Sequence, residues 1–169
     1  MTSIGALCVA CGGSSNSSTS STTLLVTYGK DPTDSAKMVC APEAQTELAA
    51  ALGAKTTSVT TPTWMDHVYR CAYDYANGSF TLAVKELPTI DDTVDFYNAE
   101  KAKHPVSQLL DLGQGGFVST DTTTVVRKDN KVLVVDVNRL PAQFGKPAEA
   151  PADASASIAV VILGCWTGQ

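Results

Sequence analysis

The sequence predicts a single α+β domain in which an antiparallel sheet is built from two hairpins and helices pack on one face of that sheet. Two pairs of apolar-rich segments are joined by the turn-forming pairs Asn77-Gly78 and Asp129-Asn130. A helical pattern precedes each pair of segments, over residues 42–52 and 91–102. With 169 residues and 44% hydrophobic content, the chain is long enough for one compact core.

The N-terminal stretch has the features of an export signal that ends at Cys11. Residues 4–13 read Ile-Gly-Ala-Leu-Cys-Val-Ala-Cys-Gly-Gly, and this order resembles the end of a bacterial lipoprotein signal. The resemblance implies that residues 1–10 are part of a signal peptide and that Cys11 becomes the lipidated first residue of the mature protein. Cys8 is a minor alternative acceptor. An apolar terminus that is not processed is the alternative to the whole signal.

The next segment predicts a flexible tether between the lipid and a folded domain. Residues 12–23 consist only of Gly, Ser, Asn and Thr, so they cannot bury enough apolar surface to offset the entropy of ordering them. Such a tether has an r.m.s. reach of roughly 20 Å, and two or more acyl chains on Cys11 would anchor the protein stably. We therefore expect a folded domain over residues 24–169, held extracytoplasmically at the outer face of the cell membrane.

The charge and hydropathy of the chain exclude some partners. Its 12 Lys and Arg residues are outnumbered by 17 Asp and Glu residues, giving a net charge of −5, so nothing favours nucleic acid as a partner. No basic cluster favours adsorption to anionic lipid. The apolar runs at residues 4–11 and 158–166 are too short to span a bilayer. Attachment to the membrane is therefore expected to come from the lipid.

The first half of the domain is expected to hold a helix and then a hairpin. In the helix, over residues 42–52, Leu48 and Leu52 share a face and Gly53 is a typical stop. The hairpin joins residues 69–75 to residues 80–84, because Asn-Gly between alternating segments is a strong hairpin signal. With Asn77 and Gly78 as the loop, three cross-strand pairs are expected: Tyr75 with Phe80, Tyr73 with Leu82, and Cys71 with Val84.

The second half repeats this order. A helix is expected over residues 91–102, where Ile90, Val94 and Tyr97 recur on one face. A hairpin over residues 123–127 and 131–137 follows, with valines on both faces, which indicates a well-covered pair of strands.

Three further features complete the expected fold. Residues 153–166 are almost continuously apolar, and the pattern leaves helix or buried strand open there. Additional strands are expected within residues 55–61 and 116–120. The Leu-Gly pairs at residues 52–53 and 112–113, each after a helix and before a hairpin, hint at an internal duplication.

The cysteines are compatible with export. Loss of Cys8 with the signal and lipidation of Cys11 leave Cys40, Cys71 and Cys165, enough for one disulfide and one remaining thiol. We favour a bridge between Cys40 and Cys71, because Cys40 lies just before the first helix and Cys71 is expected to point inward beneath it. Pairing of Cys71 with Cys165 is a serious competitor, and three buried, reduced cysteines are a third alternative.

Several short motifs together resemble one group of proteins. They are the helix after Cys40, Trp64 with Tyr69-Arg70-Cys71-Ala72-Tyr73, the hairpin of Val126-Arg127-Lys128 and Val132 to Val137, and the ending Cys165-Trp166-Thr167-Gly168. Together these look like small actinobacterial secreted lipoproteins of uncharacterised function and, more distantly, like extracellular sensor-type domains of that group. The resemblance implies the fold and the extracellular location, and it transfers no catalytic residue.

Motifs typical of hydrolases, nucleotide-binding proteins and zinc proteases are absent from the sequence. An enzyme acting at the cell envelope through Cys165 or through Asp66 and His67 is the alternative function, since a thiol nucleophile needs a nearby base and a lowered pKa. Asp91 and Asp92 are better explained as charges at a helix start than as metal ligands. No metal site and no cofactor are expected.

The aromatic residues supply the candidate binding site. Trp64, Tyr69 and Tyr73 could line a groove for a sugar or a lipid, and the alternative is that they pack in the core and across strands. The export signal, the tether and the missing catalytic motifs favour a non-catalytic cell-surface lipoprotein. Its partner is expected to be an unknown small molecule or an envelope protein.

Overall fold

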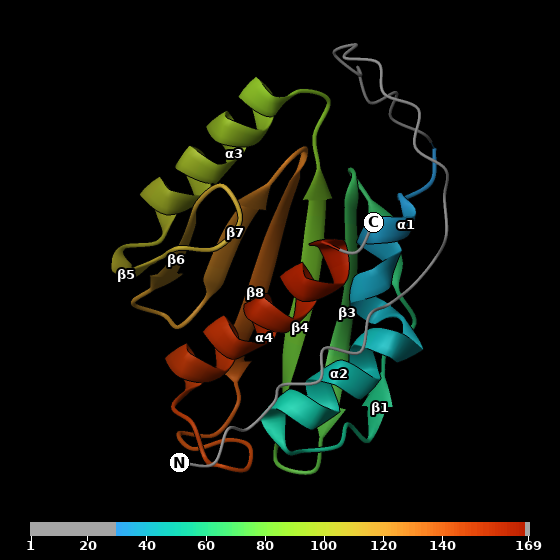
Figure 1. Ribbon diagram of the computed structural model, residues 1–169, viewed down its shortest axis with the longest axis vertical. Helices are drawn as coiled ribbons and strands as arrows, with labels where there is room; N and C mark the ends of the chain where they lie inside the picture. Colours follow the sequence, from blue (N-terminus) through green and yellow to red (C-terminus); the bar gives the residue numbers. More distant parts are fainter. Residues whose placement is uncertain (1–29, 168–169) are drawn as a thin grey trace, which may run out of the picture.

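The computed structural model describes residues 30–167 and shows a single antiparallel sheet with helices packed against it (Figure 1). The strands form the order β1-β3-β4-β8-β7-β6-β5, and β2 also pairs with β3. In chain order they are β1 Ser58–Val59, β2 Thr63–Met65, β3 Val68–Tyr75, β4 Gly78–Glu86, β5 Val106–Leu110, β6 Gly116–Ser119, β7 Thr124–Lys128 and β8 Lys131–Arg139. The two predicted hairpins, β3–β4 and β7–β8, therefore adjoin at the centre of the sheet, and the predicted α+β class is confirmed.

The helices are α1 Asp34–Lys37, continued by the 3-10 turn η1 Met38–Cys40, then α2 Pro42–Leu52, α3 Ile90–Lys103 and α4 Pro151–Thr167. Helix α2 has the predicted bounds and ends at Gly53 with the positive φ of 58° that favours glycine. Residues 153–166, for which the sequence left helix or strand open, belong to helix α4. Ala154, Ile158 and Ile162 recur every four residues along this helix and are fully buried. The short elements α1, η1, β2 and β5 were not anticipated by the sequence pattern.

The register of the first hairpin differs from the expected one by two residues. Cys71 lies opposite Leu82, Tyr73 opposite Phe80 and Tyr75 opposite Gly78, so the loop residues are Ala76 and Asn77. Gly78 belongs to β4, where a Cβ atom would lie 2.6 Å from the carbonyl oxygen of Arg139 on neighbouring β8. A shift of two residues keeps every side chain on its expected face, and Cys71 still points into the core.

The second hairpin follows the prediction. Lys128 pairs with Lys131, which leaves Asp129 and Asn130 as the loop, and Asp129 adopts the positive φ of 51° that such turns require.

Helices cover both faces of the sheet rather than one. Helices α2 and α4 pack on the face that carries Val126 and Leu133 (Figure 1). Val125 and Val132 point to the other face, where Tyr97 of α3 packs against Phe117 with 5.6 Å between ring centroids. Because β7 and β8 are apolar on both faces, each face needs a cover, and α3 supplies the second one.

The predictions for the N-terminal segments concern residues outside the described part of the chain. Cys11, the signal over residues 1–10, the tether over residues 11–23 and the first six positions of the expected domain all precede Lys30. Within residues 30–167, no helix combines the length and the apolar character needed to cross a bilayer.

Candidate functional site

The three aromatic residues predicted to line a groove have different environments. Tyr73 is fully buried, donates a hydrogen bond of 2.6 Å from its hydroxyl to the Val39 carbonyl, and stacks on Phe80 at 4.9 Å between ring centroids. Burial raises the pKa of Tyr73 well above 10.0, and the neighbouring Tyr75 and Cys165 raise it further. Tyr73 is therefore a core residue and lines no surface groove.

Trp64 and Tyr69 lie opposite each other on β2 and β3 and are partly exposed. The His67 ring meets the Trp64 ring edge-on, with 5.6 Å between centroids. The indole N–H of Trp64 donates to the Lys30 carbonyl at 2.9 Å, so this aromatic pair lies where the described chain begins. Between the strands, Asp66 and His67 both have positive φ, 51° and 58°, in a tight turn that glycine or asparagine would normally form.

The structure joins the cysteine pair that the sequence favoured. Cys40 at the end of η1 and Cys71 on β3 form a disulfide with Cα atoms 6.0 Å apart. Cys165 is outside this bridge, on α4, and is 5% exposed. The alternative enzyme would use either the thiol of Cys165, which is buried, or Asp66 and His67, which lie in an exposed turn. A thiol nucleophile needs an accessible, electropositive environment, and the burial of Cys165 does not provide the access.

A cluster of three polar side chains joins the end of α3 to the turn after β6. His104 Nδ1 lies 3.1 Å from a carboxylate oxygen of Asp121, and the hydroxyl of Ser119 donates to the other oxygen. Burial opposes ionisation of Asp121, but the bonds from Ser119, His104 and the Thr123 backbone together lower its pKa. In a catalytic triad the imidazole stands between the hydroxyl and the carboxylate. Here the carboxylate stands in the middle, so the cluster latches the helix to the turn.

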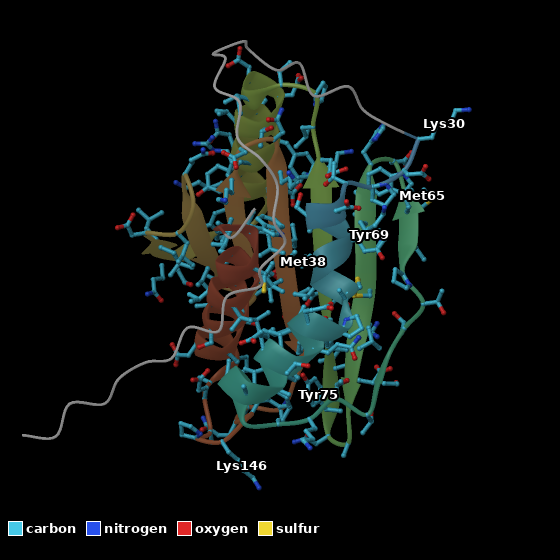
Figure 2. All side chains as sticks on the ribbon, turned by 45° about the vertical axis from the view of Figure 1, so that its right-hand side comes forward. Lys30, Met38, Met65, Tyr69, Tyr75 and Lys146 are labelled. Atoms are coloured by element: carbon cyan, nitrogen blue, oxygen red, sulfur yellow. A yellow bond between two sulfur atoms is a disulfide. The ribbon has the colours of Figure 1, made fainter. Side chains whose placement is uncertain are left out.

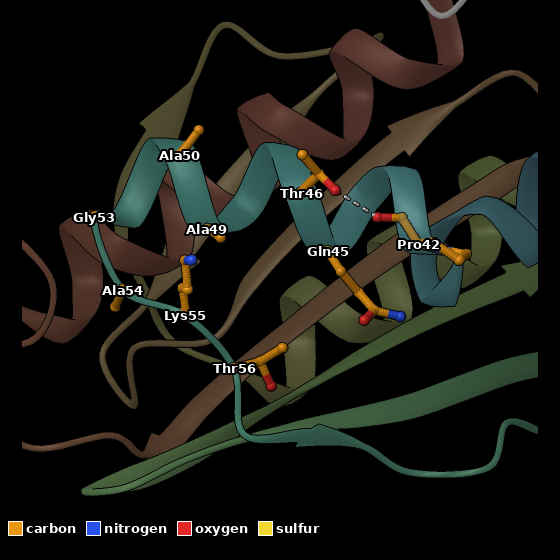
Figure 3. Close-up of a pocket in the computed structure, with 9 residues that line it drawn as sticks. All are labelled: Pro42, Gln45, Thr46, Ala49, Ala50, Gly53, Ala54, Lys55 and Thr56. Atoms are coloured by element: carbon orange, nitrogen blue, oxygen red, sulfur yellow. Dashed lines mark hydrogen bonds between the residues drawn. The ribbon is translucent and has the colours of Figure 1, made fainter.

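The sequence analysis did not anticipate a groove that runs along the outer side of α2 (Figure 3). It has a volume of about 680 Å³ and is formed by the helix and the segment that leads from it to β1. The lining residues are mostly small and uncharged: Pro42, Gln45, Thr46, Ala49, Ala50, Gly53, Ala54, Lys55 and Thr56. The sequence feature that corresponds to this groove is a face of α2 without charged or large side chains. An ordinary alanine-rich helix has the same feature, so it does not by itself predict a groove.

Most polar groups in the groove already bind the backbone. The Thr46 hydroxyl donates to the Pro42 carbonyl at 3.0 Å, the Gln45 amide to the Cys40 carbonyl at 3.3 Å, and the Thr56 hydroxyl to the Asp74 carbonyl at 2.7 Å. Lys55 is the charged member of the lining. The groove is therefore suited to holding a compact, largely uncharged group, with Lys55 available for an acceptor at one side.

The groove reaches the end of the domain opposite Lys30. A Cβ atom on Gly53 would lie 2.1 Å from the Lys146 carbonyl oxygen, so the end of α2 contacts the loop that holds Lys146. Figure 2 shows Lys30 and Met65 near one end of the molecule and Lys146 at the other.

The chain matches no family model, no curated protein and no solved structure.

Proposed function

We propose that this protein is a non-catalytic, lipid-anchored surface protein that binds a small molecule or a segment of an envelope protein in the groove along α2. The observation that carries the proposal is the position of the groove. The described chain starts at Lys30, whose carbonyl is bound by Trp64, and the groove extends to the opposite end of the domain. A domain tethered through its N-terminus would therefore hold the groove away from the membrane, open to extracellular ligands.

The export half of the proposal is supported by the sequence around Cys11, by the tether and by the Cys40–Cys71 bridge. Disulfides persist in oxidising compartments and are rare in the cytosol. The test is incorporation of labelled fatty acid by the full chain in its own host. Incorporation that is lost in Cys11→Ala and kept in Cys8→Ala supports the anchor, and no incorporation overturns it.

The groove can be tested with two neighbouring alanines of α2. Ala50 lines the groove, whereas Ala51 is exposed on the same helix and is not part of the lining. Arginine at either position suits an exposed helix site, so both Ala50→Arg and Ala51→Arg should fold. Native mass spectrometry of the gently purified full chain should show a bound molecule in the unaltered protein and in Ala51→Arg, and its loss in Ala50→Arg.

A protein partner would escape that measurement, so a second readout is needed. A photo-crosslinking amino acid placed at Thr46 should capture a discrete partner on intact cells, and Ala50→Arg should abolish the capture. Equal binding by both arginine variants, or neither a retained molecule nor a captured partner, would contradict the proposed use of the groove.

A further inference from the structure

The first described residues, Lys30 to Thr33, are bound to the end of strand β4 and to strand β2. Lys30 is held by Trp64, and the Thr33 backbone N–H donates to the carboxylate of Glu86 at 3.2 Å, with the Thr33 hydroxyl bonded to the same carboxylate. Glu86 is the last residue of β4 and is 6% exposed. The start of the described chain is therefore fixed to the end of the central strand.

Two tight turns flank this strand end. The backbone N–H of Glu86 donates to the His67 carbonyl at 2.9 Å, which brings in the β2–β3 turn. The N–H of Leu87 donates to the Asn130 carbonyl at 2.9 Å, which brings in the β7–β8 turn. We refer to this surface, made by Lys30–Thr33, the two turns and the β4–α3 connection, as the Lys30 end.

Two well-exposed apolar side chains, Met65 and Ile90, lie at the Lys30 end. Met65, directly before the β2–β3 turn, is 66% exposed, and Ile90, the first residue of α3, is 47% exposed. The partly exposed Trp64 lies beside Met65 on β2. Figure 2 shows Met65 next to Lys30 at this end. Within residues 30–167, the other exposed large apolar residues are Leu109, on edge strand β5, and Val160, in the middle of α4.

We infer that the Lys30 end docks on the outer surface of the bilayer that carries the lipid anchor, with Met65, Trp64 and Ile90 entering the headgroup region. The inference rests on the proposed anchoring at Cys11. Residues 12–29 separate Cys11 from Lys30, and a flexible linker of that length would have an r.m.s. reach of roughly 23 Å. The Lys30 end is therefore the part of the domain that the anchor keeps nearest to the lipid.

The tether makes a weak contact sufficient. Three partly exposed side chains give little affinity to a free domain, but a short flexible linker raises the local concentration of its partner to roughly the millimolar range. A docking equilibrium that would be negligible in solution then becomes well populated. Tryptophan and other side chains with an apolar body and a polar tip are also suited to the interface between lipid and water.

The charges at the Lys30 end point to neutral rather than anionic lipid. Lys30 is followed directly by Asp31. Lys85, whose ammonium donates to the Asp66 carbonyl, is offset by the carboxylate of Asp66 itself. Asp91 and Asp92 directly follow Ile90 in the first turn of α3. Docking is therefore apolar in origin, and zwitterionic phosphatidylcholine vesicles are the appropriate probe.

The test uses the full chain with an N-terminal histidine tag, bound to phosphatidylcholine vesicles that contain a nickel-chelating lipid. Trp166→Phe leaves Trp64 as the single tryptophan. Brominated phosphatidylcholine in place of the plain lipid should quench Trp64 fluorescence. Met65→Asp should lower the ratio of docked to undocked domain by about tenfold, since it removes an apolar group and adds a charge, an effect of about 1.4 kcal/mol.

Leu109→Asp is the matched control. Leu109 has the same 66% exposure as Met65 but lies on the other edge of the sheet, so its replacement should leave the quenching unchanged. Equal emission in plain and brominated vesicles, or equal loss in both aspartate variants, would refute the docking. Because the tag supplies the anchor, these results do not depend on whether Cys11 is lipidated, and the fatty-acid labelling above decides that question separately.

A measurement on the unaltered sequence covers the case in which Trp166→Phe disturbs folding. Hydrogen peroxide should oxidise the exposed Met65 readily in solution and more slowly on vesicles, as read by peptide mass spectrometry. Equal oxidation of Met65 in the two states would also contradict the inference.

Discussion

The disulfide between Cys40 and Cys71 should supply a large part of the stability of this domain. The bridge spans 31 positions of sequence and joins the end of η1 to the centre of β3. On the chain-entropy model, closing such a loop restricts the unfolded chain by about 3.7 kcal/mol. Both cysteines are buried, with 8% and 2% exposure, so replacing them with alanine also leaves a small void. The double variant Cys40→Ala/Cys71→Ala should lose about 4 kcal/mol.

Urea unfolding followed by circular dichroism measures this loss. The unaltered protein should unfold at a lower urea concentration when dithiothreitol is present, whereas the double variant should be insensitive to it. Cys165→Ala should keep the dithiothreitol effect, because Cys165 lies outside the bridge. If Cys165→Ala loses that effect, or if non-reducing peptide mapping finds Cys71 joined to Cys165, the assigned pairing and the reasoning built on it are wrong.

Three further changes test the packing and the charge state of the core. Gly53→Ala should destabilise the fold by about 2 kcal/mol or more in urea unfolding, because φ is positive there and the new Cβ would meet the Lys146 carbonyl at 2.1 Å. Gly164→Ala should stabilise it by about 0.5–1 kcal/mol, since the added Cβ in α4 would meet no atom within 4 Å other than those of its chain neighbours and its own helix backbone. Burial raises the pKa of Tyr75 from 10.0 to about 12. The burial of neutral Tyr75 should therefore contribute fully to stability below pH 10, and this contribution should be lost as the pH rises towards 12. In alkaline unfolding curves, Tyr75→Phe should reduce that loss of stability.

Much of the fold was predictable because its signals are local. The bounds of α2 follow from an apolar face that ends at Gly53, and the β7–β8 hairpin follows from Asp129 and Asn130 between alternating segments. The β3–β4 register was displaced by two residues because Gly78 is needed for the approach of the Arg139 backbone on β8. That contact joins parts of the chain that are distant in sequence, and no local pattern reports it.

The candidate sites were less predictable. Tyr69 and Tyr73 lie four residues apart on the same strand and share one of its faces, yet Tyr73 is fully buried while Tyr69, like Trp64, remains partly exposed. The difference arises because η1 covers β3 at Tyr73, whose hydroxyl bonds to the Val39 carbonyl. The groove along α2 depends on where the segment after Gly53 passes relative to the helix, which is set by pairing of β1 with β3.

The sequence by itself determined the α+β class, the two hairpins, the inward face of Cys71 and the expectation of export, because these depend on periodicity, turn residues and short motifs. Only the tertiary structure decided that α3 covers the second face, that Cys40 reaches Cys71, and that the exposed Met65 and Ile90 both belong to the Lys30 end. These features depend on how distant segments pack. Packing is decided by the combined burial of all the elements, which no single segment encodes.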